Sequence, residues 1–352
     1  MASLSRPRVA LQGVAPQGVA PPRLAKTRRP RIGVVLGAGG VLGAAWMAGA
    51  LVTLQERLPC PIGEVDLVLG TSAGGILAAA LRCGVEVEDI VEHQRGSSLV
   101  ALPNLDELDR EGGALPPLPR MPIGSPRLLA STALAPHRVH PWVAASALLL
   151  VGRGQLRSLT ALIESLLAQQ AGTGASSPTW PVRGQTWIMS VDYESGRRVA
   201  FGRPGSPAVP LPDAVVASCS IPGWYEPKVI NGRRYIDGGV RSSTSLDLLA
   251  RVDLDEVYVL APMASYDTDN PCGPSARLER WVRRMITAGL TADVQKVRAT
   301  GATVTVLTPG PEDLAAFGAN LMDPIRRRQV LETSLRTSPA AYGRLADSRS
   351  AA

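Results

Sequence analysis

The sequence predicts an α/β fold in which helices cover a mainly parallel central sheet. The apolar segment 31–36 is followed by a glycine loop and by a helix-compatible stretch over about 41–58. A second apolar segment, 66–69, leads through a turn at Ser72 into another helix-compatible stretch, 76–81. This repetition of strand, loop and helix is typical of parallel sheets with helices packed on their faces.

The rest of the chain extends the same pattern. Residues 186–191 and 198–201 alternate between apolar and polar side chains and predict two paired strands. We expect further strands over 256–260 and 302–307, and further helices over 86–94, 143–170, 277–298 and 324–345. Between the helices, eight prolines fall within residues 102–142 and predict an insertion, while small residues over 171–177 predict a linker.

Composition indicates a globular protein with a basic N-terminal arm. Apolar residues make up 45% of the 352 residues and charged residues 19%. The net charge of +7 comes from residues 1–31, which hold seven cations, no acid and no periodic apolar pattern. We interpret residues 1–30 as a disordered, solvated arm, with contact to anionic lipid or nucleic acid as the alternative.

The sequence also favours a cytoplasmic protein. It has no continuous apolar core of a signal peptide and no run of 18 apolar residues that would span a bilayer. The four cysteines are far apart, so we expect neither a disulfide framework nor structural zinc. The three histidines, His93, His137 and His140, likewise predict no metal site.

Ser72 is the first candidate for catalysis. It occupies the centre of the G-x-S-x-G motif formed by residues 70–74, between a predicted strand and a predicted helix. A sharp turn at this place exposes the hydroxyl, and the glycines Gly70 and Gly74 allow the turn without steric collision. The positive end of the following helix favours negative charge beside the serine oxygen. The same residues are also compatible with a simple turn of small side chains.

A second glycine loop, residues 37–43, precedes Ser72. Successive backbone amides in such a loop can converge on an anion, which in acyl transfer is the tetrahedral oxyanion. The alternative is a dinucleotide loop, but Leu42 stands where G-x-G-x-x-G requires its last glycine. No acid ends the second strand, where a ribose-binding carboxylate would belong. We therefore favour an oxyanion hole made by Gly37, Gly39 and Gly40.

Asp237 is the candidate base. It ends an apolar segment and is followed by Gly238 and Gly239, which allow close approach of the backbone, although a D-G turn in a hairpin explains the same letters. No histidine occurs after His140, so the late histidine of a Ser–Asp–His triad is excluded. An aspartate that acts directly on the serine is then the economical alternative.

Four ordered blocks resemble the patatin-like phospholipases. They are G-x-G-G-x-x-G at 37–43, G-T-S-A-G-G at 70–75, the segment 217–227 and D-G-G at 237–239. The resemblance covers roughly residues 30–261 and implies a three-layer α/β/α fold and a serine esterase with a Ser72–Asp237 dyad. It implies a hydrolase that cleaves carboxylic esters of phospholipids or other lipids through an acyl-enzyme, with no metal or organic cofactor.

This resemblance assigns a catalytic domain to residues 31–310 and a C-terminal helical extension to residues 311–352. Leu42 stands where many relatives have Arg or Lys, so a neutral lipid or a short-chain ester is an alternative substrate. A non-catalytic lipid-binding module of the same fold is a further alternative.

We expect any peripheral membrane contact through the basic arm or the insertion 102–142, and no nucleic-acid partner. The insertion interleaves apolar side chains with cations, which fits a lid or a lipid-docking surface. A loop packed on the core is the alternative. The apolar side chains concerned are those of Met121, Ile123, Leu128, Leu129 and Trp142.

Overall fold

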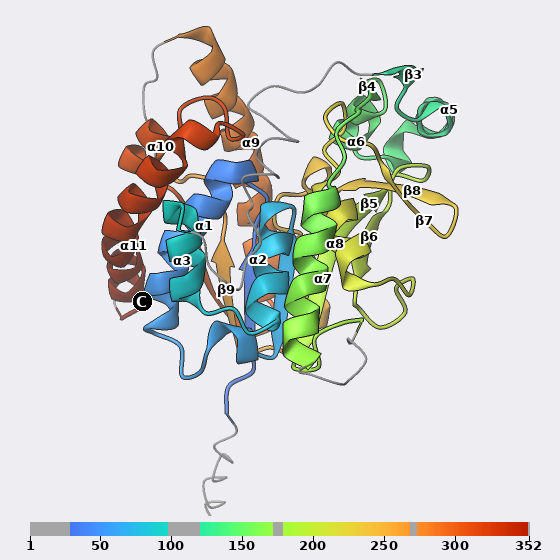
Figure 1. The fold of residues 1–352 in the computed structure, drawn as a ribbon. Helices are drawn as coiled ribbons and strands as arrows, with labels where there is room; N and C mark the ends of the chain where they lie inside the picture. Colours follow the sequence, from blue (N-terminus) through green and yellow to red (C-terminus); the bar gives the residue numbers. More distant parts are fainter. Residues whose placement is uncertain (1–28, 98–119, 172–178, 268–272, 351–352) are drawn as a thin grey trace, which may run out of the picture.

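The computed structural model describes residues 29–97, 120–171, 179–267 and 273–350. The N-terminal arm predicted over 1–30 and the linker predicted over 171–177 therefore lie almost entirely outside the described residues. The described elements form one central sheet with helices on both faces (Figure 1).

The sheet has eight strands in the order β10-β9-β1-β2-β5-β8-β7, with β6 also paired to β5. Five neighbouring strands, from β10 to β5, are parallel, whereas β6, β7 and β8 pair in antiparallel fashion. The predicted α/β fold with a mainly parallel sheet is confirmed. The strands are β1 (Ile32–Leu36), β2 (Leu67–Thr71), β5 (Gln185–Asp192), β6 (Arg198–Phe201), β7 (Lys228–Ile230), β8 (Arg233–Asp237), β9 (Glu256–Leu260) and β10 (Thr303–Leu307).

One face of the sheet is covered by helices that share the largest apolar core, and α1, α2, α3 and α7 lie beside one another there (Figure 1). The opposite face is covered by the 3-10 helix η4 (Leu246–Arg251) and by α9 (Pro274–Arg298). The helices of the first face are α1 (Gly40–Gln55), α2 (Ala73–Arg82), α3 (Val87–Arg95), α7 (Arg157–Ala171), α8 (Leu211–Cys219), α10 (Pro311–Phe317) and α11 (Arg327–Ser350).

The C-terminal helices belong to this same core. Val330 and Leu331 of α11 are completely buried in the cluster that also holds Trp46 of α1. The Ser334 hydroxyl donates to the Trp46 carbonyl at 2.7 Å, so α11 packs directly on α1. The extension proposed for residues 311–352 thus stabilises the layer that covers the sheet.

The single helix predicted over 143–170 is wrong. The chain forms α6 (Pro141–Ser146), then the short strand β4 (Leu150–Val151), and only then α7. A Cβ atom on Gly152 would lie 2.4 Å from the backbone of Trp224. The chain at Gly152 therefore passes too close to Trp224 to leave room for the side chains of a continuous helix. Gly154 forms an isolated bridge to Tyr225 at the same place.

The described part of the insertion is anchored to the protein at a few buried positions, among them Ser125, Leu128 and Val139. It contains β3 (Arg120–Ile123), which pairs with β4, and α5 (Pro126–Leu134). Leu128 is fully buried against Val191 and Ile236 of the sheet, which corrects the expectation that it faces outward. Ile123 and Trp142 do remain 45% and 43% exposed. Residues 102–119 lie outside the described part.

None of the helices described is both long and apolar enough to cross a lipid bilayer.

Candidate active site

Ser72 occupies the sharp turn between β2 and α2 and is 5% exposed. Its backbone has φ 54° and ψ −123°, a left-handed conformation that a residue with a side chain rarely adopts. Neighbouring glycines make room for it, since a Cβ atom on Gly70 would lie 2.4 Å from the Gly74 carbonyl oxygen. The strained turn is the arrangement expected of a nucleophile elbow.

Ser218, at the C-terminal end of α8, holds the elbow from the other side. The Ser72 amide donates to the Ser218 hydroxyl oxygen at 2.8 Å, and that hydroxyl donates to the Met189 carbonyl of β5 at 2.6 Å. Ser218 is completely buried. The side chain therefore ties the turn at Ser72 to the neighbouring strand.

Asp237 ends β8, and its carboxylate accepts a hydrogen bond from the Gly239 amide at 2.7 Å. Burial raises the pKa of the Asp237 carboxyl to about 6, against the neighbouring Ser72 hydroxyl and the Gly239 amide, which lower it. The structure thus brings together the two residues that the sequence nominates. A pKa near neutrality suits a general base, which must accept and release a proton at working pH.

The close packing around Asp237 requires glycine at the next two positions. A Cβ atom on Gly238 would lie 2.6 Å from the Met189 carbonyl oxygen, and one on Gly239 would lie 3.0 Å from the Ala38 side chain. The base and the first glycine loop therefore meet directly.

The glycine loop corrects one residue of the predicted oxyanion hole. The Gly37 amide donates to the Leu260 carbonyl at 2.9 Å and continues the sheet, and the Ala38 amide donates to the Ser243 carbonyl at 2.8 Å. The Gly37 amide is therefore already hydrogen-bonded and is not available to an oxyanion. In the described part of the chain, no acceptor is found for the amides of Gly39 and Gly40 at the N-terminus of α1. These two amides stay available to an anion.

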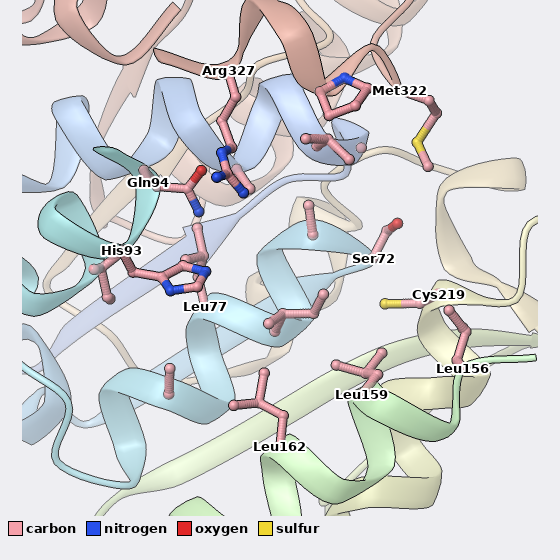
Figure 2. Close-up of a pocket in the computed structure, with 18 of the residues that line it drawn as sticks. Ser72, Leu77, His93, Gln94, Leu156, Leu159, Leu162, Cys219, Met322 and Arg327 are labelled. Atoms are coloured by element: carbon pink, nitrogen blue, oxygen red, sulfur yellow. The ribbon is translucent and has the colours of Figure 1, made fainter. Parts of the chain in front are cut away.

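A cavity of about 140 Å³ opens beside Ser72 between α1, α2, α3, α7 and the start of α11. Its wall is mostly apolar, with Ile76, Leu77 and Ala80 from α2 facing Leu156, Leu159 and Leu162. Figure 2 shows Ser72 and Cys219 at one side of the cavity and His93 and Gln94 at the other. The shape and lining fit an aliphatic chain attached to a group at Ser72.

Several lining residues are not predicted from the sequence. His93, Gln94 and Arg327 come from α3 and α11 and form the polar part of the wall. Burial and the nearby Asp237 raise the pKa of the Cys219 thiol, which keeps it in its unreactive protonated form. Local sequence gave no signal for these residues because only the packing of distant helices brings them to the cavity.

Leu42 does not line the cavity. It lies in the first turn of α1, is completely buried and packs in the main core. Among the described residues, no cluster of three metal-ligating side chains occurs.

Solved structures similar to this chain include VipD from Legionella pneumophila, at 13% identity and a TM-score of 0.39. The ExoU–SpcU complex of Pseudomonas aeruginosa matches at 20% identity and 0.33, and human GIVD cytosolic phospholipase A2 at 13% and 0.37. The matches cover 87%, 76% and 89% of this chain and 67%, 52% and 58% of the others. The chain thus spans between about half and two thirds of their lengths.

No curated protein matches the chain. A family model for patatin-like phospholipases matches residues 34–250, which is more than half of the chain and includes every block on which the resemblance rests. With this match, the chain belongs to the patatin-like phospholipase family.

Proposed function

We propose that the protein is a lipid acyl hydrolase that cleaves carboxylic esters of phospholipids or other lipids with Ser72 as nucleophile and Asp237 as general base. Family membership supports a lipid hydrolase. The observation that carries the mechanism is the buried Asp237 carboxyl beside the hydroxyl of a strained serine, with its pKa raised to about 6.

In this mechanism the Ser72 oxygen attacks the ester carbonyl while its proton passes to Asp237. The negative charge that develops on the carbonyl oxygen is stabilised by the amides of Gly39 and Gly40. Asp237 then returns the proton to the departing alcohol, which leaves an acyl group on Ser72. Water attacks this acyl-enzyme and loses a proton to Asp237; the bond between the serine oxygen and the acyl carbon then breaks, the acid leaves, and Asp237 returns the proton to the Ser72 oxygen. No step requires a metal or a cofactor.

Covalent labelling with a fluorophosphonate tests the nucleophile. The reagent is expected to add one phosphonyl group to the wild-type protein, and peptide mapping should place it on Ser72. Ser72→Ala should remain unlabelled, while Asp237→Asn should be labelled more slowly because its serine lacks a base. Unchanged labelling of Ser72→Ala would contradict the proposal, and so would the complete inertness of the wild-type protein, as expected of a non-catalytic lipid-binding module.

A short-chain or neutral-lipid esterase on the same dyad is the second candidate, and the size of the cavity favours it. A cavity of roughly 150 Å³ holds a molecule of about six carbon atoms. The cavity beside Ser72 measures about 140 Å³.

Chain-length selectivity distinguishes the two candidates. For p-nitrophenyl esters we expect the highest kcat/KM at about six acyl carbons, and Leu159→Ala should move the optimum to longer chains because this side chain lines the cavity. Leu331→Ala is the matched control, since Leu331 is equally buried but lies outside the cavity. A wild-type preference for long-chain phospholipid, unaltered by Leu159→Ala, would favour the phospholipase instead.

Peripheral contact with lipid is part of the proposal. Exposed apolar side chains of the insertion region, namely Ile123, Trp142, Leu148 and Leu149, support a contact surface there. Side chains of this kind bind weakly to the interface between water and lipid. The basic arm remains a second place for such contact.

A further inference from the structure

A second, larger cavity lies on the other side of the Asp237 turn. Its volume is about 550 Å³, and it forms a groove between residues 239–244, α6 and α9. Gly239, whose amide holds the Asp237 carboxylate, belongs to its wall. Ser72 is not among the residues that line this groove. The groove is therefore a separate site that borders the catalytic turn.

The polar end of the groove carries one unbalanced positive charge. Arg241 lines it, and among the described residues no carboxylate forms a salt bridge with this guanidinium, which Asp247 and Asp293 attract only at longer range. The nearby Asp247 is already bound by Arg198 through two contacts of 2.6 Å. The other charged lining residues, Lys296 and Asp293, are paired with each other at 2.8 Å.

His140 is consistent with a single unbalanced positive charge in the groove. It lines the groove, and its Nδ1 atom has no hydrogen-bond partner among the described residues. Burial, together with the charges of Arg241 and Arg198, lowers the pKa of this imidazole. The neutral ring adds no charge at pH 7, so a single anion would balance the groove.

The opposite end of the groove is apolar and long enough for an aliphatic chain. The apolar part of the lining follows α9 from Val282 to Ala292, a rise of about 15 Å. Met285 and Ile286 lie along it, and Trp142 closes one side. At the exposed rim, Trp142 packs edge-on against Trp281 with ring centroids 6.4 Å apart. Because two opposed acyl chains fill a bilayer core of about 30 Å, one chain needs about 15 Å.

We propose that this groove binds a long-chain fatty-acid anion, with its carboxylate at Arg241 and its chain along α9 toward Trp142. A carboxylate carries the one negative charge that the groove lacks, whereas a phosphate monoester carries nearly two. A fatty acid is also the product of the hydrolysis proposed above, but the binding does not depend on that reaction.

Calorimetric titration of the full-length protein with palmitate, below the concentration at which it aggregates, tests the proposal. Arg241→Gln is expected to weaken binding by about ten-fold or more, because it removes a charge-assisted hydrogen bond. Arg327→Gln, which removes the cation of the Ser72 cavity, should leave this affinity unchanged. Hexadecanol should bind far more weakly than palmitate.

A second variant keeps the test independent of the stability of Arg241→Gln. A Cβ atom on Gly289 of α9 meets nothing within 4 Å, so the first atom of a new side chain is accommodated there, and Gly289→Trp is chosen to fill the groove. It should abolish palmitate binding. Wild-type affinity in both Arg241→Gln and Gly289→Trp would overturn the proposal. Equal binding of hexadecanol, or tighter binding of hexadecyl phosphate, would overturn the assignment of a carboxylate.

Discussion

Ser72→Ala is expected to lower ester turnover by about 10⁶-fold, and Asp237→Asn by about 10³-fold. The first change removes the nucleophile. The second keeps an oxygen that can accept the Gly239 amide but removes the group that takes the serine proton. Rates of hydrolysis of one ester, measured at several substrate concentrations, would give both losses in kcat.

The matched control is Ser220→Ala. Ser220 is a buried serine beside the site, its carbonyl accepts the Asp237 amide at 3.0 Å, and its hydroxyl donates to the Val216 carbonyl at 2.9 Å. The Ser220 hydroxyl takes part in no proton transfer of the proposed mechanism, so Ser220→Ala should change kcat little. A loss in Ser220→Ala equal to that in Asp237→Asn would mean that disturbed packing, rather than a missing base, lowers the rate.

Gly74→Ala is expected to lower the free energy of unfolding by about 4 kcal/mol or more. The added Cβ atom would lie 2.0 Å from the Leu36 carbonyl oxygen and 2.4 Å from the Leu36 carbonyl carbon, both of which belong to the backbone of β1. Neither atom can yield without displacing a central strand. Urea unfolding of the wild-type and variant proteins measures the difference.

The adjacent Gly75→Ala is the control for this second prediction. Its new Cβ atom would first meet the Ser218 hydroxyl at 3.4 Å, an ordinary contact with a side chain. Alanine also favours helix more than glycine does, so the free energy of unfolding should change by less than about 1 kcal/mol. Similar losses in the two variants would show that close approach to β1 is not what requires glycine at position 74.

The start of the fold could be predicted because β1 and β2 are apolar segments, each joined by a glycine turn to a helix-compatible stretch. The element over 143–170 could not, because its residues are individually compatible with helix, and only the close passage of Gly152 past Trp224 interrupts it. Helix α8 was likewise not predicted from the sequence.

The dyad was nominated from local signals, namely a G-x-S-x-G turn and an aspartate before two glycines. The predicted oxyanion hole includes Gly37 in error, because sequence alone does not reveal that the Gly37 amide donates to the Leu260 carbonyl. Arg241 and Arg327 carry no motif, and the block 217–227 does not reveal that its Ser218 binds the Ser72 amide. Their positions follow from the packing of α8, of the turn after β8 and of α11, which are contacts between residues far apart in the chain.

The dependence of kcat/KM on pH, measured with one soluble ester for the wild-type protein and Asp237→Asn, tests the central claim most directly. Asp237 must be ionised to accept the serine proton, and burial raises its pKa to about 6. The wild-type rate should therefore rise with pH through about 6 and level off above it, since kcat/KM reports the free enzyme. The small residual rate of Asp237→Asn should lack this rise. A wild-type profile that is flat across pH 5–7, or the same rise in Asp237→Asn, would contradict the assignment of Asp237 as the base.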